Sequence, residues 1–300
     1  MLALFVYGIV EGSIIALGAI GLTMVFGILR FINFAHGDIM TLGAYLSFLV
    51  LGLLSRAGLD GPSFPYLSFG FPLIAAMIFS MALTAAAAIG INRLLYKPLR
   101  KLKSPSVTLG MSSLGVAFIL LSLVNIAWTP QIQFYSVGIQ VALNLPMGVK
   151  IKPDQIFIFL CALLLSVSMY LFMEKCKMGK AMRASSDNMD LAEVGGIDTE
   201  KVINWTWAIG AALAAAAGTL YGIDVQLRPT MGWNLLLSVF AAAILGGIGN
   251  PYGAMIAGMI IGVVEHCSTA VIPPDYKSAV SFLVILILLL FRPSGLFGRK

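Results

Sequence analysis

Charged side chains are scarce in this 300-residue chain: they make up 11% of the sequence, whereas hydrophobic residues make up 59%. A soluble domain carries about 25% charged residues, so this composition excludes one. No polar tail or soluble module is present to form a second domain, and the mean hydropathy is +0.96. We therefore expect a single all-α domain over residues 1–300, a polytopic transmembrane helical bundle of about 8–10 helices.

Cysteine is also rare. Cys161, Cys176 and Cys267 follow neither a disulfide pattern nor a metal-ligand spacing, so we expect small buried thiols and no metal site. The glycine-rich phosphate loop GxxxxGK[S/T] is absent from the sequence, so we expect no ATP hydrolysis by this chain alone, no cofactor and no enzyme. The net charge of +6 comes from bases interleaved with apolar runs, which indicates membrane topology and not nucleic-acid binding.

Apolar runs recur along the whole chain, and a helix that crosses the hydrocarbon needs about 20 mostly apolar residues. The first run contains Glu11 and has no basic segment before it, so we interpret it as a mature span and not as a signal peptide. The last and the third-last runs are short for a span. The predicted spans are residues 2–28, 39–55, 69–91, 107–128, 154–173, 203–223, 235–248, 252–271 and 279–291.

The basic residues predict the orientation, because Lys and Arg stay on the cytoplasmic side of a membrane. We interpret segment 92–104 as a cytoplasmic loop, since it holds five bases and no acid. Segment 174–201 brings five more bases to the same side, and the C-terminus adds Arg292, Arg299 and Lys300. With alternating spans, the N-terminus is expected outside and the C-terminus inside.

Two polar breaks interrupt the apolar pattern, one in each half of the chain. The first holds Asn33, His36 and Asp38, and the second holds Gly247 and Asn250. Such paired interruptions are typical of a substrate path in pseudo-symmetric or inverted repeats, because irregular backbone at membrane depth needs protein or water around it. Two simpler interpretations remain open: a short cytoplasmic loop in which Asp38 caps the next helix, and a tight turn before a helix that Pro251 opens.

Acidic residues inside the spans are the second group of candidates. Glu11 is expected to face the bundle interior or a wet cavity, because an isolated charge in lipid is costly. Glu265 and His266 lie near the outer end of their span, where they also fit an interfacial pair. The hypothetical path therefore comprises Glu11, Asn33, His36, Asp38, Gly247, Asn250 and Glu265.

Two other classes of function are alternatives to a path. An intramembrane enzyme would use His36 with Asp38, or Glu265 with His266, as an acid/base pair, but no nucleophile motif or metal spacing accompanies them. An ion-coupled secondary carrier would need charges at mid-depth in several spans, and Glu11 is the clearest one here.

The longest charged stretch, 174–201, contains "RASSDNMDLAEVGGI". We expect one short amphipathic helix there, ended by Gly195 and Gly196. A mixed-charge helix held outside the bilayer is typical of a docking element for a partner protein.

Segments 21–48, 178–222 and 241–265, which include "FINFAHGD", "RASSDNMDLAEVGG" and "GGIGNPYG", resemble in order and spacing the permeases of bacterial branched-chain amino acid ABC importers. Urea and short-chain amide permeases of that family share these motifs. The resemblance covers nearly the whole chain. It implies a multi-pass inner-membrane subunit, surrounded by lipid, that pairs with a sister permease, two cytoplasmic ATPases and a periplasmic or lipid-anchored binding protein. It also implies an ATPase-coupling loop, formed by Arg183, Ala184, Asp187, Ala192, Glu193, Gly195 and Gly196.

Overall fold

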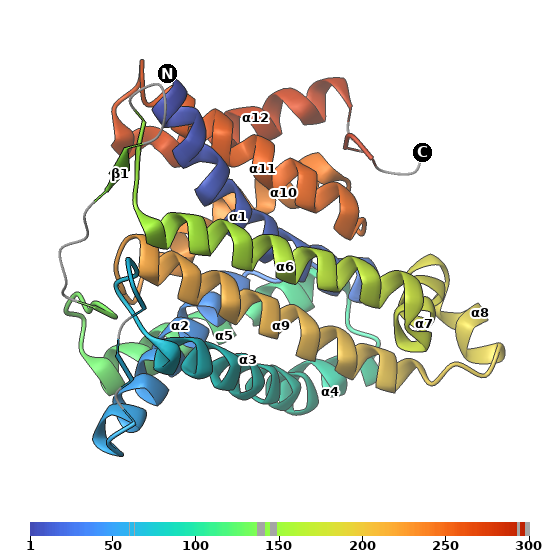
Figure 1. Ribbon diagram of the computed structural model, residues 1–300. Helices are drawn as coiled ribbons and strands as arrows, with labels where there is room; N and C mark the ends of the chain where they lie inside the picture. Colours follow the sequence, from blue (N-terminus) through green and yellow to red (C-terminus); the bar gives the residue numbers. More distant parts are fainter. Residues whose placement is uncertain (60, 63, 137–141, 145–148, 293–294, 298–300) are drawn as a thin grey trace.

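The computed structural model describes residues 1–59, 61–62, 64–136, 142–144, 149–292 and 295–297. Each of the nine predicted spans falls on a helix, and the helices pack side by side into one bundle (Figure 1). These helices are α1 (Leu2–Leu29), α2 (His36–Arg56), α3 (Phe71–Ile91), α5 (Ser106–Trp128), α6 (Pro153–Lys175), α9 (Thr199–Asp224), α10 (Met231–Gly246), α11 (Pro251–Ser268) and α12 (Lys277–Phe291).

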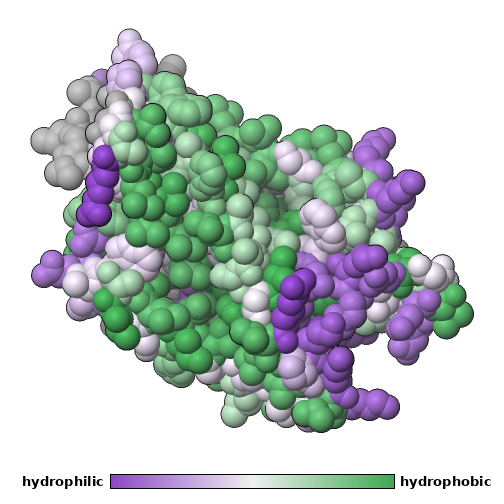
Figure 2. All heavy atoms as spheres, turned by 90° about the horizontal axis from the view of Figure 1, so that it is seen from below, coloured by the Kyte–Doolittle hydropathy of each residue, from purple (hydrophilic) through white to green (hydrophobic). Residues whose placement is uncertain are grey.

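Within the described residues, six helical segments are long and apolar enough to cross a membrane: α1, α2, α3 with its extension to Lys101, α5, α6 and α9. The helices α10 and α12 are shorter apolar helices, as the sequence predicted for the runs 235–248 and 279–291. Figure 2, which views the molecule from below, shows hydrophobic side chains over most of that face. Hydrophilic side chains gather mainly toward one end, with a smaller number at the other. The chain is thus an all-α, multi-pass membrane protein.

The two ends of the bundle differ. The strands β1 (Leu143–Asn144) and β2 (Lys150–Ile151) form a small antiparallel hairpin at one end, near the N-terminus, and we call this the β1 end (Figure 1). The helices α7 (Lys177–Asp187) and α8 (Met189–Val194) lie at the opposite end, which we call the α7 end (Figure 1). The basic segments predicted to be cytoplasmic lie at the α7 end, whereas Arg299 and Lys300 lie outside the described residues.

Segment 92–104 is mostly helical and not a loop, which corrects the sequence interpretation. The helix α3 continues through a π-turn, η1 (Asn92–Tyr96), into α4 (Lys97–Lys101), and the Lys97 N–H bonds to the Asn92 carbonyl five residues back. Pro98 explains the π-turn, because a proline clashes with the carbonyl four residues earlier and a widened turn relieves that clash. Lys97 then pairs with Glu200 at 3.0 Å, which joins α4 to α9.

The thiols of all three cysteines are unpaired, but none is fully buried as expected: Cys161 and Cys267 are half-buried and Cys176 is exposed. We therefore correct the expectation of buried thiols, most clearly for Cys176. It lies at the junction of α6 and α7, where the chain leaves the apolar bundle.

The bundle contains two sets of four helices with matching contacts. The first set is α1, α2, α3 and α5, and the second is α9, α10, α11 and α12. In the first set, α2 packs on α3 and α5; in the second, α10 packs on α11 and α12. Across the sets, α1 packs on α10 and α11, while α9 packs on α2 and α3. The helix α1 starts at the β1 end, where the Tyr7 hydroxyl donates to the Lys150 carbonyl at 2.6 Å, and α9 starts beside α8 at the opposite end. The two sets therefore have the arrangement of an inverted repeat.

The sets meet at two glycine pairs. A Cβ atom on Gly21 would overlap the carbonyl of Gly210, and one on Gly37 would overlap the backbone of Gly232. The segment that matches the first break is thus 225–230, which precedes α10 as 30–35 precedes α2. This corrects the pairing of the first break with residues 246–253: that turn follows α10 and has its counterpart after α2.

Candidate functional site

The first break turns back into the bundle. The helix α1 ends at Leu29, yet the His36 Nε2 atom at the start of α2 lies 2.9 Å from the carbonyl oxygen of Gly18. At 1.5 Å per residue, Gly18 lies about 16 Å from the end of α1. Segment 30–35 therefore climbs back along α1, and α2 begins near the middle of the membrane. This geometry favours a break within the membrane over a loop at its surface.

The polar side chains of the first break are enclosed by protein. Asn33, His36 and Asp38 are each at most 3% exposed. The Asn33 Oδ1 atom accepts from the Ala35 N–H at 3.2 Å, and the Ser113 hydroxyl accepts from the Phe34 N–H at 2.9 Å. Ala35 is the N-cap of α2, and Asp38 lies in its first turn. Burial in protein, rather than an open wet cavity, keeps these groups out of lipid in this conformation.

The second break is a tight turn, as the simpler interpretation predicted. Gly247 and Gly249 have φ angles of 96° and 85°, which only glycine adopts without strain. The Asn250 Oδ1 atom accepts from the backbone N–H groups of Tyr252 and Gly253 at 3.1 and 3.2 Å, and Pro251 opens α11. Gly247 and Asn250 thus shape the turn between α10 and α11 at the α7 end.

A cleft of about 790 Å³ lies at the α7 end. It brings together residues of the hypothetical path and residues of the predicted ATPase-coupling loop. Its walls are the end of α1, the helix α7 and the turn between α10 and α11. Asn250 from the path hypothesis lines this cleft beside Arg183 and Asp187 from the predicted coupling loop. Arg30, where the first break begins, lines it as well.

Glu11 and Glu265 lie far from this cleft, toward the β1 end. Glu11 is near the start of α1 and Glu265 near the end of α11, whereas the cleft is lined by the opposite ends of these two helices. Glu11 is 13% exposed at its side chain and forms an ion pair with Lys277, and its Oε2 atom also lies 3.0 Å from the Nδ1 atom of His266. Glu11 thus faces the interior, as expected. Because its charge is paired, its burial costs far less than that of an isolated carboxylate.

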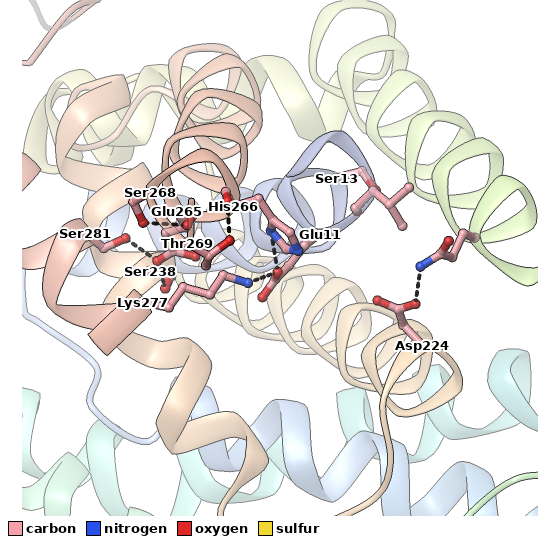
Figure 3. A network of polar contacts seen from close by, with 12 residues as sticks. Glu11, Ser13, Asp224, Ser238, Glu265, His266, Ser268, Thr269, Lys277 and Ser281 are labelled. Atoms are coloured by element: carbon pink, nitrogen blue, oxygen red, sulfur yellow. Dashed lines mark hydrogen bonds and ion pairs between the residues drawn. The ribbon is translucent and has the colours of Figure 1, made fainter. Parts of the chain in front are cut away.

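Glu265 and His266 do not form an interfacial pair. Glu265 is 2% exposed and accepts hydrogen bonds from the hydroxyls of Ser238, at 2.5 Å, and Ser281 (Figure 3). His266 instead faces Glu11. Sequence reasoning missed Lys277, Ser238 and Ser281. Lys277 carried a usable signal, because a base at the outer end of a span is uncommon.

The predicted single helix in 174–201 is two helices, α7 and α8, which is a correction. Asn188 has φ −154° and ψ 110° and separates them, and its Oδ1 atom caps α8 by accepting from the Leu191 N–H at 3.0 Å. Asparagine competes with the helix by bonding to nearby backbone, which explains the interruption.

The expected end of this element at Gly195 and Gly196 is confirmed. Gly196 has φ 83°, and the Ile197 N–H bonds to the Ala192 carbonyl at 3.0 Å, as in a Schellman cap. The backbone N–H of Lys201 bonds to the next cap, Asp198, and holds the pKa of that carboxyl below its usual range.

The helix α7 is anchored to the bundle. The Arg183 Nη1 atom donates to Glu174 Oε1 at 2.5 Å, and the Tyr252 hydroxyl donates to the same oxygen at 2.7 Å. The hydrogen bond to Glu174 raises the pKa of Arg183, so its charge is secure. The helix α8 projects beyond this anchor and exposes Leu191 by 69% and Val194 by 87%.

The predicted coupling residues divide between these two helices and the cap that follows. Ala192 is buried, whereas Glu193, Gly195 and Gly196 are exposed on α8 and its cap; Arg183, Ala184 and Asp187 lie on α7. Sequence reasoning missed Leu191 and Val194, because only the structure shows that these apolar side chains point away from the bundle.

Comparison with known proteins gives a consistent result. The permease BraD of the high-affinity branched-chain amino acid transport system of Pseudomonas aeruginosa is 36% identical over 98% of this chain and 94% of its own. The corresponding permease LivH of Escherichia coli K12 is 35% identical over 97% and 94%. A probable branched-chain amino acid transport permease of Methanocaldococcus jannaschii is 29% identical over 97% and 90%. No solved structure is significantly similar to the chain.

The family model described as "Branched-chain amino acid transport system / permease component" matches residues 4–289. These relatives are transport permeases and not enzymes, as the sequence resemblance implied. The chain therefore belongs to the family of branched-chain amino acid transport system permease components.

Proposed function

We propose that this chain is a permease subunit of a bacterial inner-membrane ABC importer for branched-chain amino acids. With a sister permease it forms the translocation path, two cytoplasmic ATPases drive the transport, and a periplasmic or lipid-anchored binding protein delivers the substrate. The observation that carries this proposal is the projecting helix α8, whose exposed Leu191 and Val194 offer an apolar docking point for a separate protein.

The sequence explains why a separate protein is needed. The chain has no phosphate-binding loop, so energy has to arrive through a contact. The helix α8 lies at the α7 end, the end richest in bases, which the positive-inside rule places in the cytoplasm with the ATPases. A short capped helix is rigid, so it transmits a displacement of the ATPase to the permease better than a flexible loop does.

A route leads from α8 to the first break. The helix α7 is fixed to α6 and α11 through Glu174, as described above. The Arg30 Nη2 atom donates to the Ser186 carbonyl at 2.9 Å, and the Ser186 hydroxyl donates to the Gly27 carbonyl at 3.1 Å. Movement of α7 is thus passed to the end of α1 and to segment 30–35, where α2 begins in mid-membrane.

The last turns of α1 also contact the second break. The Thr23 hydroxyl accepts from the Gly249 N–H at 2.9 Å, so α1 is bonded to the turn between α10 and α11. ATPase closure would therefore move both breaks together. In this mechanism Asn33, His36 and Asp38 are enclosed in one state and meet the path in another.

The test is a tagged purification in mild detergent, followed by reconstitution into liposomes with the binding protein. We expect two ATPases and a second permease in stoichiometric amounts, and ATP-driven uptake of leucine, isoleucine and valine that excess urea does not inhibit. A chain that purifies alone and moves none of these amino acids would refute the proposal. Uptake inhibited by urea would reassign the substrate to the amide branch of the family.

A further inference from the structure

Segment 30–35 reaches the surface of the bundle at membrane depth. It starts at Arg30, near the end of α1, and rises about 16 Å to His36, so Phe34 lies roughly halfway up. Ile32 is 46% exposed, and its carbonyl faces Gly110 and Ser113 on α5. Ile32 thus brings one residue of irregular chain to the surface where a helix would normally face lipid, while Phe31 and Asn33 on either side of it are buried.

This stretch holds unused hydrogen-bond donors. Among the described residues, the backbone N–H groups of Phe31, Ile32 and Asn33 have no acceptor. The Nδ2 group of Asn33, on a side chain that is 1% exposed, has none within the described chain either. Hydrocarbon cannot satisfy such groups, so we expect water or a polar ligand to pair with them when the segment meets the path in another state of the transport cycle.

The helix α10 supplies an apolar wall beside these donors. The rings of Phe34 and Phe240 meet edge to face with their centroids 5.7 Å apart. Phe240 belongs to a row of incompletely buried apolar residues at three- and four-residue spacing along α10, formed by Trp233, Leu237, Phe240 and Ile244. Ile32 and the half-buried rings of Phe34 and Phe240 therefore lie at the surface of the bundle beside the buried Asn33, and we call these four residues the Phe34 face (Ile32, Asn33, Phe34 and Phe240).

We propose that the Phe34 face is a substrate contact of the translocation path. The unpaired N–H groups of segment 31–33 donate to the carboxylate of the amino acid, and Phe34 and Phe240 contact its aliphatic side chain. This inference rests on the proposed function and adds to it a place and a chemistry for recognition. A carboxylate in mid-membrane needs donors, and an apolar side chain needs an apolar wall.

The test uses single cysteines in the complete transporter in liposomes. The native cysteines are first replaced by serine, and Ile32→Cys and Phe240→Cys are then introduced separately. Each variant is treated with a charged, membrane-impermeant methanethiosulfonate reagent applied on both sides. The matched control is Leu164→Cys in the middle of α6, where the native side chain is 65% exposed but lies on regular helix. We expect the Ile32→Cys and Phe240→Cys variants to react at least tenfold faster than the Leu164→Cys control.

Leucine and leucinamide then separate the two parts of the inference. We expect leucine to slow the labelling several-fold and leucinamide, which lacks the carboxylate, to protect poorly. Equal protection by both compounds would overturn the role of the donors. Labelling no faster than in the Leu164→Cys control, or no protection by leucine, would overturn the contact itself. ATP-driven leucine uptake by the cysteine-free parent keeps these failures distinct from failure of the proposed function.

Discussion

Glu11 and Lys277 show how this chain carries charge inside a bundle. Their side chains are 13% and 22% exposed and belong to α1 and α12, which are at opposite ends of the sequence. Either charge alone would be expensive at this depth, whereas the pair is tolerated. The pair and the bonds from Ser238 and Ser281 to Glu265 together hold α12 to α1, α10 and α11.

Removing only the base should therefore destabilise the protein strongly. We expect Lys277→Met to cost about 3 kcal/mol of unfolding free energy, because it leaves the Glu11 carboxylate with His266 alone. The double variant Glu11→Gln with Lys277→Met should recover most of this loss, since neither residue is then charged. Thermal unfolding in detergent measures both. Equal melting temperatures for the single and double variants would contradict this prediction, because removal of the unpaired carboxylate would then have restored nothing.

Substitution of Asn250 should lower the unfolding free energy less than substitution of Lys277, and through the loss of a helix cap rather than of an ion pair. Its side chain caps α11, so Asn250→Ala should lower the unfolding free energy by about 1 kcal/mol, whereas Asn250→Asp, which keeps an acceptor oxygen, should lower it less. Uptake per folded molecule should stay close to normal in both variants. A large loss of uptake at normal stability would instead assign Asn250 to the path.

At the scale of elements, a seam of small residues fixes the contact of α1 with α11. Cβ atoms on Gly258 and Gly262 would overlap Ala16 and Gly12, respectively, so the two backbones touch. In lipid such close packing replaces the hydrophobic effect as the source of helix association.

Filling this seam should separate the two helices. We expect Gly262→Ala to cost about 2 kcal/mol through overpacking. Gly90→Ala is the matched control on α3, because nothing lies within 4 Å of a Cβ atom there, and it should be neutral or stabilising by up to about 1 kcal/mol. Chemical unfolding in detergent compares the two. A Gly262→Ala variant as stable as Gly90→Ala would contradict the seam.

Elements were more predictable than their ends. The nine spans could be located because long apolar runs mark them directly, and the Schellman end at Gly196 because two glycines mark it. The π-turn before Pro98 could not be predicted, because it depends on a local steric clash. The interruption at Asn188 could not be predicted either, because it depends on side-chain hydrogen bonding to the backbone, and hydropathy reports neither effect. The depth of segment 30–35 also escaped the sequence, because it depends on the contact of His36 with Gly18.

The candidate site was predictable only in part, for a similar reason. Polar residues in apolar runs identified Asn33, His36 and Glu11, but not their partners. Phe34 and Phe240 contribute through exposure on the assembled surface, and nothing in an apolar sequence distinguishes such residues from those that face lipid.

At the scale of the whole molecule, the proposed function makes transport depend on contact with a second protein at α8. Val194→Asp should place a carboxylate in an apolar contact and weaken ATPase binding about tenfold, or by about 1.4 kcal/mol. Co-purified ATPase and leucine uptake should fall together, while the sister permease still co-purifies. Leu102→Asp is the control, because Leu102 is 77% exposed just after α4 at the same end but lies off α8. Normal ATPase recovery with Val194→Asp would place the docking point elsewhere.

The glycine contact between α2 and α10 has a consequence for biosynthesis. The Gly232 N–H bonds to the Thr41 hydroxyl across 191 residues of sequence. At about 5–20 residues per second, a ribosome makes α10 roughly 10–40 seconds after α2. Until then Gly37 and Thr41 lack their partner on α10, and segment 30–35 has the cover that Tyr96 and α5 give it but not that of α10, so we expect this segment to enter the bundle late. A chain stopped before α10 should accordingly be cut by trypsin after Arg30 much faster than the full-length protein.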